Sequence, residues 1–298
     1  MLQAVASTNV ATKNRTFFLF FSKEGNFKFI IMKKYDNIQW VVQKNLTGED
    51  ILTDLKKSCE NIGVDYIEVE VIPFTTDLPI FPNEKRSIFY GSTTFNNLVY
   101  GDHTLNGGLF FNTNFSIENY FEKYGKYMLN YGAKVTTFKD VMEMDYEPDQ
   151  ILFIRPNDDT KSFAGDTKSF KDIGEWYKAL KAFENTNLGL DTKIIVAEPF
   201  NIKSEWRLWI VNKKVVASSK YREYFKLKKQ EGCPIEVIEF AEQRCNEYTP
   251  HDAFVMDIGL CGDEYYIIEC GCLNAAGFYK SNIQNIVSSV TEYFLNLK

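Results

Sequence analysis

The first third of the chain alternates short apolar stretches with polar turns, a pattern typical of strands. A helix is predicted to begin near Thr47, because Glu49 and Asp50 then fall in its first turn. The predicted strands of this region are 17–21, 27–32, 38–42, 66–72 and a short strand that ends in the turn at Gly91. Strands with an intervening helix predict a small α/β unit.

A second unit is predicted to begin near residue 112, where Ser116 is expected to cap a helix that runs towards residue 131. Residues 149–155 read as a buried strand, and a polar loop follows at 156–168. The remaining predicted elements are a helix at 171–183, a strand at 193–200, hairpins at 205–222 and 254–269, and an amphipathic helix at 281–297. This half of the chain therefore also mixes helices and strands.

The first hairpin is expected to turn at Asn212-Lys213, where asparagine tolerates positive φ. Residue 205 then faces 220, and 207 faces 218, because side chains alternate between the faces of a strand. One face would carry Glu205, Arg207, Ser218, Lys220 and Arg222. Two interpretations stay open: a half-exposed sheet with salt bridges on its wet face, and a cation-rich floor for an anionic ligand.

The second hairpin is expected to turn through three residues, 262–264, which places Asp257 opposite Glu269. Two facing carboxylates destabilise a sheet unless a cation or a shared proton compensates for them. Mg²⁺ is a natural compensator, since it takes one or two carboxylates together with substrate phosphates. A two-residue turn would instead place Asp257 opposite Ile268, so the inference depends on the length of the turn.

Composition narrows the function classes. The 298 residues are 45% hydrophobic and 25% charged, which is typical of a globular protein and not of a disordered one. A net charge of −6 disfavours nucleic acid as the main partner. Apolar runs are too short for a membrane helix, and the six cysteines are expected to be reduced thiols. We expect a cytoplasmic protein, in the host cytoplasm if its source is viral.

The order of motifs resembles the ATP-grasp superfamily. These motifs are Arg155-Pro156 before a polar loop, the segment 196–200, Glu205-x-Arg207, and Asp257 followed by Glu269. More narrowly, the chain resembles the phage and bacterial ATP-grasp clade in which arginine replaces the lysine of the central subdomain. The resemblance implies an α+β fold of two subdomains that clasp a nucleotide, at 111–200 and 201–298, after a small α/β domain at 1–110.

The resemblance also implies a set of nucleotide-binding residues. Arg155 and the loop 157–168 take the place of the phosphate-binding lysine and loop, and arginine keeps the charge and adds a bidentate fork. An upstream lysine of the family is matched by Lys123, with Lys126 as the competitor. Glu198 and Phe200 match the adenine-binding hinge, Glu205 matches the acid that holds the ribose, and Lys220 matches a phosphate-binding lysine.

The metal ligands implied by the resemblance are Asp257 and Glu269. Many members continue Glu-x-Asn, but here Gly271 stands at that position. Either Asn274 reaches the metal instead, or one ligand is missing. The arginine that often precedes the first metal aspartate is also absent, so Arg207 or Arg222 would stabilise charge on the acyl phosphate.

The implied activity is an ATP- and Mg²⁺-dependent ligase that joins a carboxylate to an amine through an acyl phosphate. Its substrates would be small molecules or peptides. Two alternatives stay open: a small-molecule kinase on the same scaffold, with a hydroxyl acceptor, and an inactive nucleotide-binding scaffold.

Overall fold

The computed structural model describes residues 3–6, 15–21, 27–72, 75–105, 107–158, 162–182 and 188–297. The chain divides into two compact units: unit 1 is Met1–Leu109 together with Ile283–Lys298, and unit 2 is Phe110–Asn282. This division differs from the predicted boundaries, because the last helix belongs to unit 1 and both expected subdomains of the nucleotide-binding part lie in unit 2.

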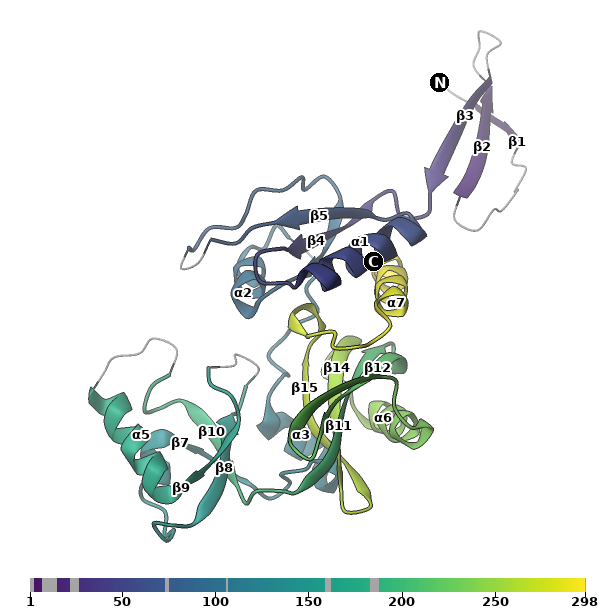
Figure 1. Ribbon diagram of the computed structural model, residues 1–298. Coiled ribbons are helices and arrows are strands. Elements are labelled where there is room, and N and C mark those ends of the chain that lie inside the picture. The colour runs from purple at the N-terminus through teal and green to yellow at the C-terminus, as the bar shows by residue number, and fades with distance from the viewer. Residues whose placement is uncertain are drawn as a thin grey trace. The chain divides into compact units, whose positions relative to one another are not determined.

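Unit 1 contains two three-stranded sheets (Figure 1). One is antiparallel, in the order β1 (Gln3–Ala6), β2 (Arg15–Phe21), β3 (Phe27–Lys33). The other is parallel, with β4 (Ile38–Gln43) between β5 (Asp65–Val69) and β6 (Arg86–Tyr90). The strands predicted in this region are therefore confirmed, with the fourth ending three residues earlier than expected.

Three helices complete unit 1: α1 (Glu49–Ile62), α2 (Thr93–Gly101) and α7 (Ile283–Asn296). Helices α1 and α7 pack against each other, and Trp40 Nε1 of β4 donates a buried 2.9 Å hydrogen bond to Thr291 Oγ1 of α7. Helix α2 buries Phe95 and Val99 against Val41 and Phe89. The parallel sheet is thus covered by helices, as parallel sheets require.

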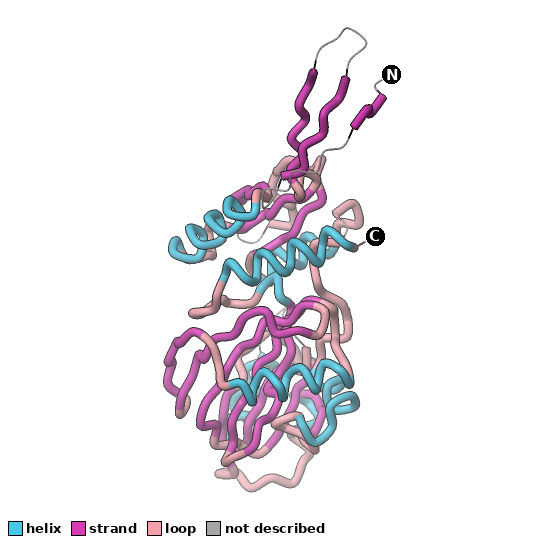
Figure 2. The backbone as a smooth tube through the Cα atoms, turned by 90° about the vertical axis from the view of Figure 1, so that its right-hand side faces the viewer, coloured by secondary structure: helices cyan, strands magenta, loops and turns pink. Residues whose placement is uncertain are grey.

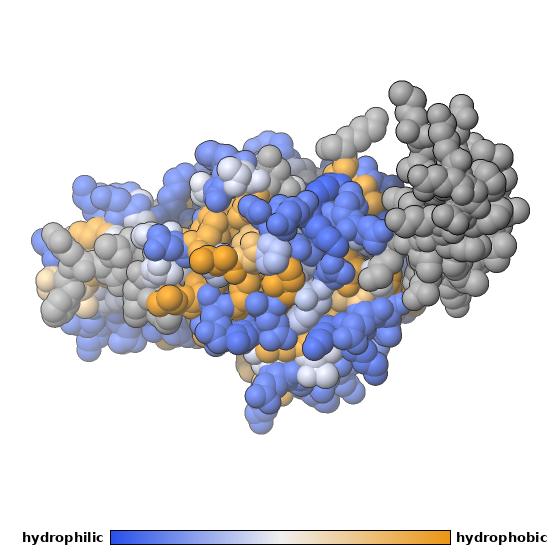
Figure 3. Space-filling model, turned by 90° about the horizontal axis from the view of Figure 1, so that it is seen from above, coloured by the Kyte–Doolittle hydropathy of each residue, from blue (hydrophilic) through white to orange (hydrophobic). Residues whose placement is uncertain are grey.

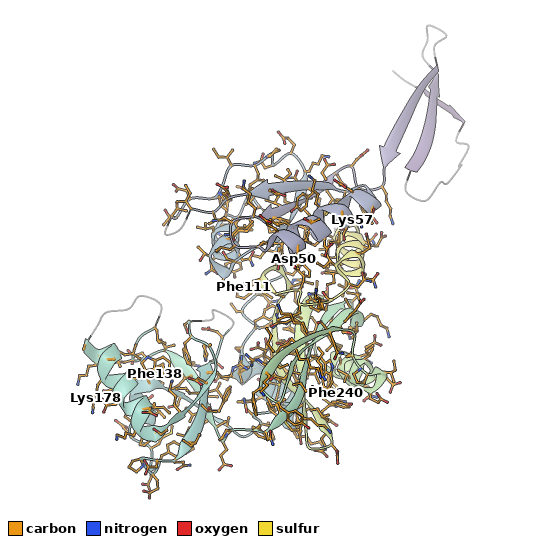
Figure 4. The ribbon with its side chains drawn as sticks, in the orientation of Figure 1. Asp50, Lys57, Phe111, Phe138, Lys178 and Phe240 are labelled. Atoms are coloured by element: carbon orange, nitrogen blue, oxygen red, sulfur yellow. The ribbon has the colours of Figure 1, made fainter. Side chains whose placement is uncertain are left out.

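The first sheet of unit 2 has the order β7-β10-β8-β9, with every neighbouring pair antiparallel. Its elements are β7 (Lys134–Thr137), α4 (Phe138–Val141), β8 (Ile151–Pro156), β9 (Asp166–Ser169), α5 (Phe170–Ala182) and β10 (Lys193–Ala197). Helix α5 packs on this sheet, where Phe138 meets Trp176 at 5.0 Å between ring centroids, whereas Lys178 points outwards (Figure 4).

The second sheet of unit 2 has the order β13-β12-β11-β14-β15 and is wholly antiparallel. Its strands are β11 (Ile202–Val211), β12 (Lys214–Glu223), β13 (Lys226–Glu231), β14 (Ala253–Cys261) and β15 (Glu264–Cys272). Helices α3 (Ile117–Tyr124) and α6 (Ile235–Glu247) share one core with it. Short 3₁₀ helices lie at Gly125–Tyr127 and Leu273–Ala275. The tube view follows these strands from the side (Figure 2).

The predicted pairing of the first hairpin is wrong, although its turn at Asn212-Lys213 is confirmed by φ values of 49° and 65°. Irregularities between 205 and 206 and between 209 and 210 shift the register. Glu205 therefore lies opposite Arg222, and Trp206 lies opposite Lys220. A bulge moves the following side chains to the opposite face, so Lys220 and Tyr221 exchange their predicted sides.

The predicted pairing of Asp257 with Glu269 is confirmed, but for a different reason. The turn has two residues, since Cys261 pairs with Glu264, and that length alone would place Asp257 opposite Ile268. An irregularity between 257 and 258 leaves Ile268 unpaired and restores the facing carboxylates.

No helix among the described residues is long and apolar enough to cross a membrane. Viewed from above, the surface carries apolar side chains between polar ones (Figure 3). In unit 1 the most exposed large apolar side chains include Leu46, Ile72 and Ile80.

Candidate functional site

A cleft of about 500 Å³ lies between the two sheets of unit 2. This volume is in the range of small-molecule sites. One wall contains Phe153, Arg155 and Gly165, and the other contains residues of β11, β12 and β15. The charged side chains that line it are Arg155, Asp166, Glu205, Arg222 and Glu269. Acidic and basic groups from segments far apart in the sequence therefore meet in one cavity.

Arg155 joins the two walls. It lies on β8, and its guanidinium Nη1 donates a 3.2 Å hydrogen bond to the Ile268 carbonyl while Nη2 pairs with the Glu269 carboxylate. Gly165 lies close to this strand, because a Cβ placed there would be 3.0 Å from the Phe153 ring and 3.4 Å from Arg155 Cβ. A side chain at 165 would crowd the cleft beside Arg155.

Asp257 is neutralised inside its own sheet. It is 3% exposed and accepts two hydrogen bonds from Arg207 on β11, of 2.8 Å from Nε and 2.7 Å from Nη2. The Tyr221 hydroxyl donates a third, at 3.3 Å. Each acid of the facing pair thus has its own arginine, a bidentate one for Asp257 and one from the other sheet for Glu269.

Glu205 is the third carboxylate of the site and is also buried, at 4% exposure. Burial raises the pKa of its carboxyl above the ordinary value, and Asp257 and Glu269 add to that effect, whereas Tyr221 and Arg222 oppose it. Arg222 Nη1 lies 3.9 Å from Glu205 Oε1. The cleft therefore holds a cluster in which acids and arginines alternate.

Several residues implied by the family resemblance lie elsewhere. Lys220 pairs with Glu223 at 2.5 Å, its Nζ lies 5.9 Å from the centroid of the Trp206 ring, and it is absent from the described lining of the cleft. Lys123 pairs with its neighbour Glu122 at 2.7 Å on the surface, and its competitor Lys126 lies over the Tyr127 ring.

The hinge and asparagine positions are split between surroundings. Phe200 lines the cleft and also a second hollow of about 380 Å³, whereas Glu198 lines only that hollow. Asn274 is fully buried, and its Oδ1 accepts a 2.7 Å hydrogen bond from the Phe110 backbone N–H. This bond gives Asn274 a structural role at the start of unit 2.

The acid pair offers hard oxygen donors that suit Mg²⁺. In the described part of the chain, no three His, Cys, Asp or Glu side chains are spaced to hold a metal ion together. Mg²⁺ sites commonly use one or two carboxylates and complete their shell with phosphates and water. A carboxylate has about four lone-pair sites, so Asp257 and Glu269 retain acceptor capacity beside their arginines. The residues fit Mg²⁺ bound together with a phosphate ligand.

The comparisons with solved structures define the class of fold. A RimK domain protein ATP-grasp from Sphaerobacter thermophilus matches with a TM-score of 0.56 at 10% identity, covering 87% of this chain and 100% of that one. The macrocyclase MdnC from Microcystis aeruginosa, bound with precursor peptide MdnA, matches with a TM-score of 0.52 at 11% identity, covering 87% and 100%. The ATP-grasp ligase PsnB, complexed with a precursor variant, Mg and ADP, gives 0.53 at 9% identity, covering 87% and 98%. The chain has the ATP-grasp fold.

The family follows from the sequence match. The model of an ATP-grasp domain, family 2 of its clade, matches residues 132–288, which is more than half of the chain. The chain therefore belongs to this ATP-grasp family, and both the predicted superfamily and the α+β fold are confirmed. No curated protein sequence matches it.

Sequence reasoning missed Tyr221 as a residue of the site. Its place in an alternating strand predicted an apolar face, but the hydroxyl contacts Asp257 and the ring lines the cleft. It also missed Tyr279, whose ring stacks on Tyr221 at 4.9 Å. No local pattern pointed to either, because both depend on the bulge in β12 and on a loop distant in sequence.

Proposed function

We propose that the chain is an ATP- and Mg²⁺-dependent ligase that joins a carboxylate to an amine and releases ADP and phosphate. The observation that carries this proposal is the meeting of Arg155 from one sheet with the facing acids of the other inside a single cleft. Membership of the ATP-grasp family supports ATP as the nucleotide.

The cleft would divide between the parts of ATP. Pro199 and Phe200 would meet the adenine, and Glu205 would accept hydrogen bonds from the ribose hydroxyls. Arg155 and Arg222 would bind phosphate oxygens, for which guanidinium forks are suited. The predicted phosphate role of Lys220 requires its side chain to leave Glu223, so we assign the phosphates to the two arginines that line the cleft.

Asp257 and Glu269 would hold Mg²⁺, which when bound would neutralise phosphate charge and orient the transferring group. The substrate carboxylate would attack the γ-phosphorus, the bond to the bridging oxygen would break, and ADP would leave. The amine would then attack the acyl carbon and lose a proton as phosphate departs. Arg207, fixed by Asp257, would place positive charge beside the developing negative charge.

The acceptor remains a choice between small molecules and peptides. The solved structures of PsnB and MdnC contain precursor peptides, which supports a peptide carboxylate as one substrate class. Both reactants would be soluble molecules, and we propose a cytoplasmic setting for the reaction.

One observation keeps the inactive scaffold as a second candidate. Each acid of the facing pair is already neutralised by an arginine, so the pair persists without a metal and does not by itself require catalysis. A kinase would use the same nucleotide residues and differ in its hydroxyl acceptor.

The test measures thermal unfolding of the wild type with Mg²⁺ alone, ATP alone and both. A ligand at one hundred times its dissociation constant stabilises a protein by about 2.7 kcal/mol, so we expect a clear midpoint shift with both together. Glu269→Gln should lose the part of the shift that requires both ligands. Glu264→Gln is the matched control, because it lies on the same strand but outside the described lining of the cleft.

Product analysis then separates the candidates. ADP release that requires a carboxylate and an amine together identifies a ligase, whereas release with a hydroxyl compound alone identifies a kinase. An unchanged unfolding midpoint in the wild type under all ligand conditions would leave only the scaffold.

A further inference from the structure

Tyr279 has a backbone conformation that its residue type rarely adopts. Its φ is +52°, in the left-handed region, where a non-glycine residue costs about 1–3 kcal/mol when its surroundings impose it. Both neighbours are fixed: Phe278 is buried and stacks on Trp209 at 6.1 Å, and the Lys280 N–H donates to Ser219 Oγ at 3.2 Å. The fold therefore holds the Tyr279 ring in place at an energetic cost.

The Tyr279 ring lies one ring away from the cleft. It stacks on Tyr221 with 4.9 Å between centroids and 10° between planes, and Tyr221 lines the cleft. Two cations lie near the Tyr279 centroid: the Arg207 guanidinium carbon at 5.1 Å and the Lys229 ammonium at 6.0 Å. They come from β11 and β13, on either side of β12. Three strands and one loop thus build a single aromatic and cationic cluster.

The cluster has more positive charge than its protein partners use. Asp257 occupies Nε and Nη2 of Arg207, and the described residues give Nη1 no acceptor. Lys229 is exposed and has no acidic side chain within ion-pair distance in the described ranges. Two cations near one ring repel each other, and an anion between them would relieve that repulsion. A tyrosine pair beside them limits water and favours a bound ion.

We propose that Arg207, Lys229 and Tyr279 form a subsite for a second anionic group of the substrate. The inference rests on the proposed ligase function. Neither Tyr279 nor Lys229 is in the described lining of the cleft, and Tyr221 separates Tyr279 from it. A group bound there therefore belongs to the molecule whose reacting carboxylate enters the cleft, and not to the nucleotide. The substrate class is a compound with one reacting carboxylate and a second carboxylate or phosphate.

The test is calorimetric binding of three peptides in the presence of Mg²⁺ and a non-hydrolysable ATP analogue. The probes are N-acetyl-diglutamate, N-acetyl-diglutamine and N-acetyl-diphosphoserine, all with a free α-carboxyl group. We expect the diglutamate to bind at least ten-fold more tightly than the diglutamine. Tighter binding of the phosphoserine peptide than of diglutamate would identify phosphate as the preferred group.

Lys229→Gln should reduce the preference for diglutamate at least five-fold. Lys226→Gln is the matched control, because Lys226 is also exposed on β13 and carries the same charge. Equal binding of charged and neutral peptides, no binding of any of them, or an equal loss in both variants would overturn the subsite. A wild type that binds the analogue with Mg²⁺ but does not discriminate between the peptides refutes only the subsite, whereas failure to bind the analogue refutes the ligase.

Discussion

The two facing acids, Asp257 and Glu269, are neutralised in different ways. Arg207 and Asp257 lie on adjacent strands of one sheet, with side chains 13% and 3% exposed. Arg155 and Glu269 come from different sheets, with side chains 12% and 30% exposed, and both line the cleft. One pair belongs to the interior of a sheet, and the other spans a cavity.

This difference separates stability from ligand exchange. A ligand that displaced Arg207 from Asp257 would leave a buried charge unpaired, which is costly. A ligand that drew Arg155 from Glu269 would act at the cleft wall, where phosphate and Mg²⁺ could replace the two partners. Glu269 and Arg155 are therefore the pair that we expect to change partners on nucleotide binding.

The largest expected effect comes from breaking the interior pair. Asp257→Asn leaves the Arg207 charge uncompensated, so we expect the free energy of unfolding to fall by about 3–5 kcal/mol. The double variant Arg207→Met with Asp257→Leu removes both charges and should recover most of that loss. Urea unfolding of the three proteins measures it, and a loss below about 1 kcal/mol in Asp257→Asn would contradict a buried pair.

A smaller stability effect and a larger binding effect are expected at the cleft pair. Because Glu269 is partly exposed, Arg155→Met should cost only about 1 kcal/mol of unfolding free energy. The same change should weaken ATP binding at least ten-fold, since it removes a guanidinium fork, and Arg155→Lys should weaken it less. Titration with ATP and Mg²⁺ measures the binding, and urea unfolding measures the stability.

The control for this comparison is Lys168→Met on β9, which removes a cation outside the described lining of the cleft. Equal weakening of ATP binding by Lys168→Met and Arg155→Met would mean that general charge, and not the position of Arg155, determines affinity.

The smallest effect sharpens the comparison at the residues beside Arg207. Tyr279→Ala and Tyr279→Gly both remove the ring, but only glycine relieves the positive φ. We expect the glycine variant to be more stable than the alanine variant by about 1 kcal/mol. Urea midpoints at equal slope test this difference, and equal stability of the two variants would show that Tyr279 stores no backbone strain.

The sequence predicted the fold class through the order of its motifs, and it predicted the facing acids through strand pairing. The order from Arg155-Pro156 to Glu269 is local information, and it survives in the fold. The residues around these acids were harder to predict. Compensation was assigned to a metal, because nothing in the local pattern places Arg207 and Arg155 against two acids that are distant along the chain.

Bulges account for the other errors. One bulge corrected a wrong turn length at Asp257, and another moved Lys220 away from its predicted face. Bulges arise where a strand must follow the packing of its neighbours, so their positions depend on the assembled sheet. Strand β13 was missed for a simpler reason: its residues are all exposed and carry no apolar alternation.

The return of α7 to unit 1 sets an order of events during synthesis. Unit 2 is continuous in sequence, but unit 1 needs Thr291 to meet Trp40 across some 250 residues of chain. Domains generally fold as their sequence leaves the ribosome, yet here the unit that emerges first is completed last. The core of unit 2 can close while unit 1 still lacks α7, so nascent unit 1 exposes the face that α7 later covers.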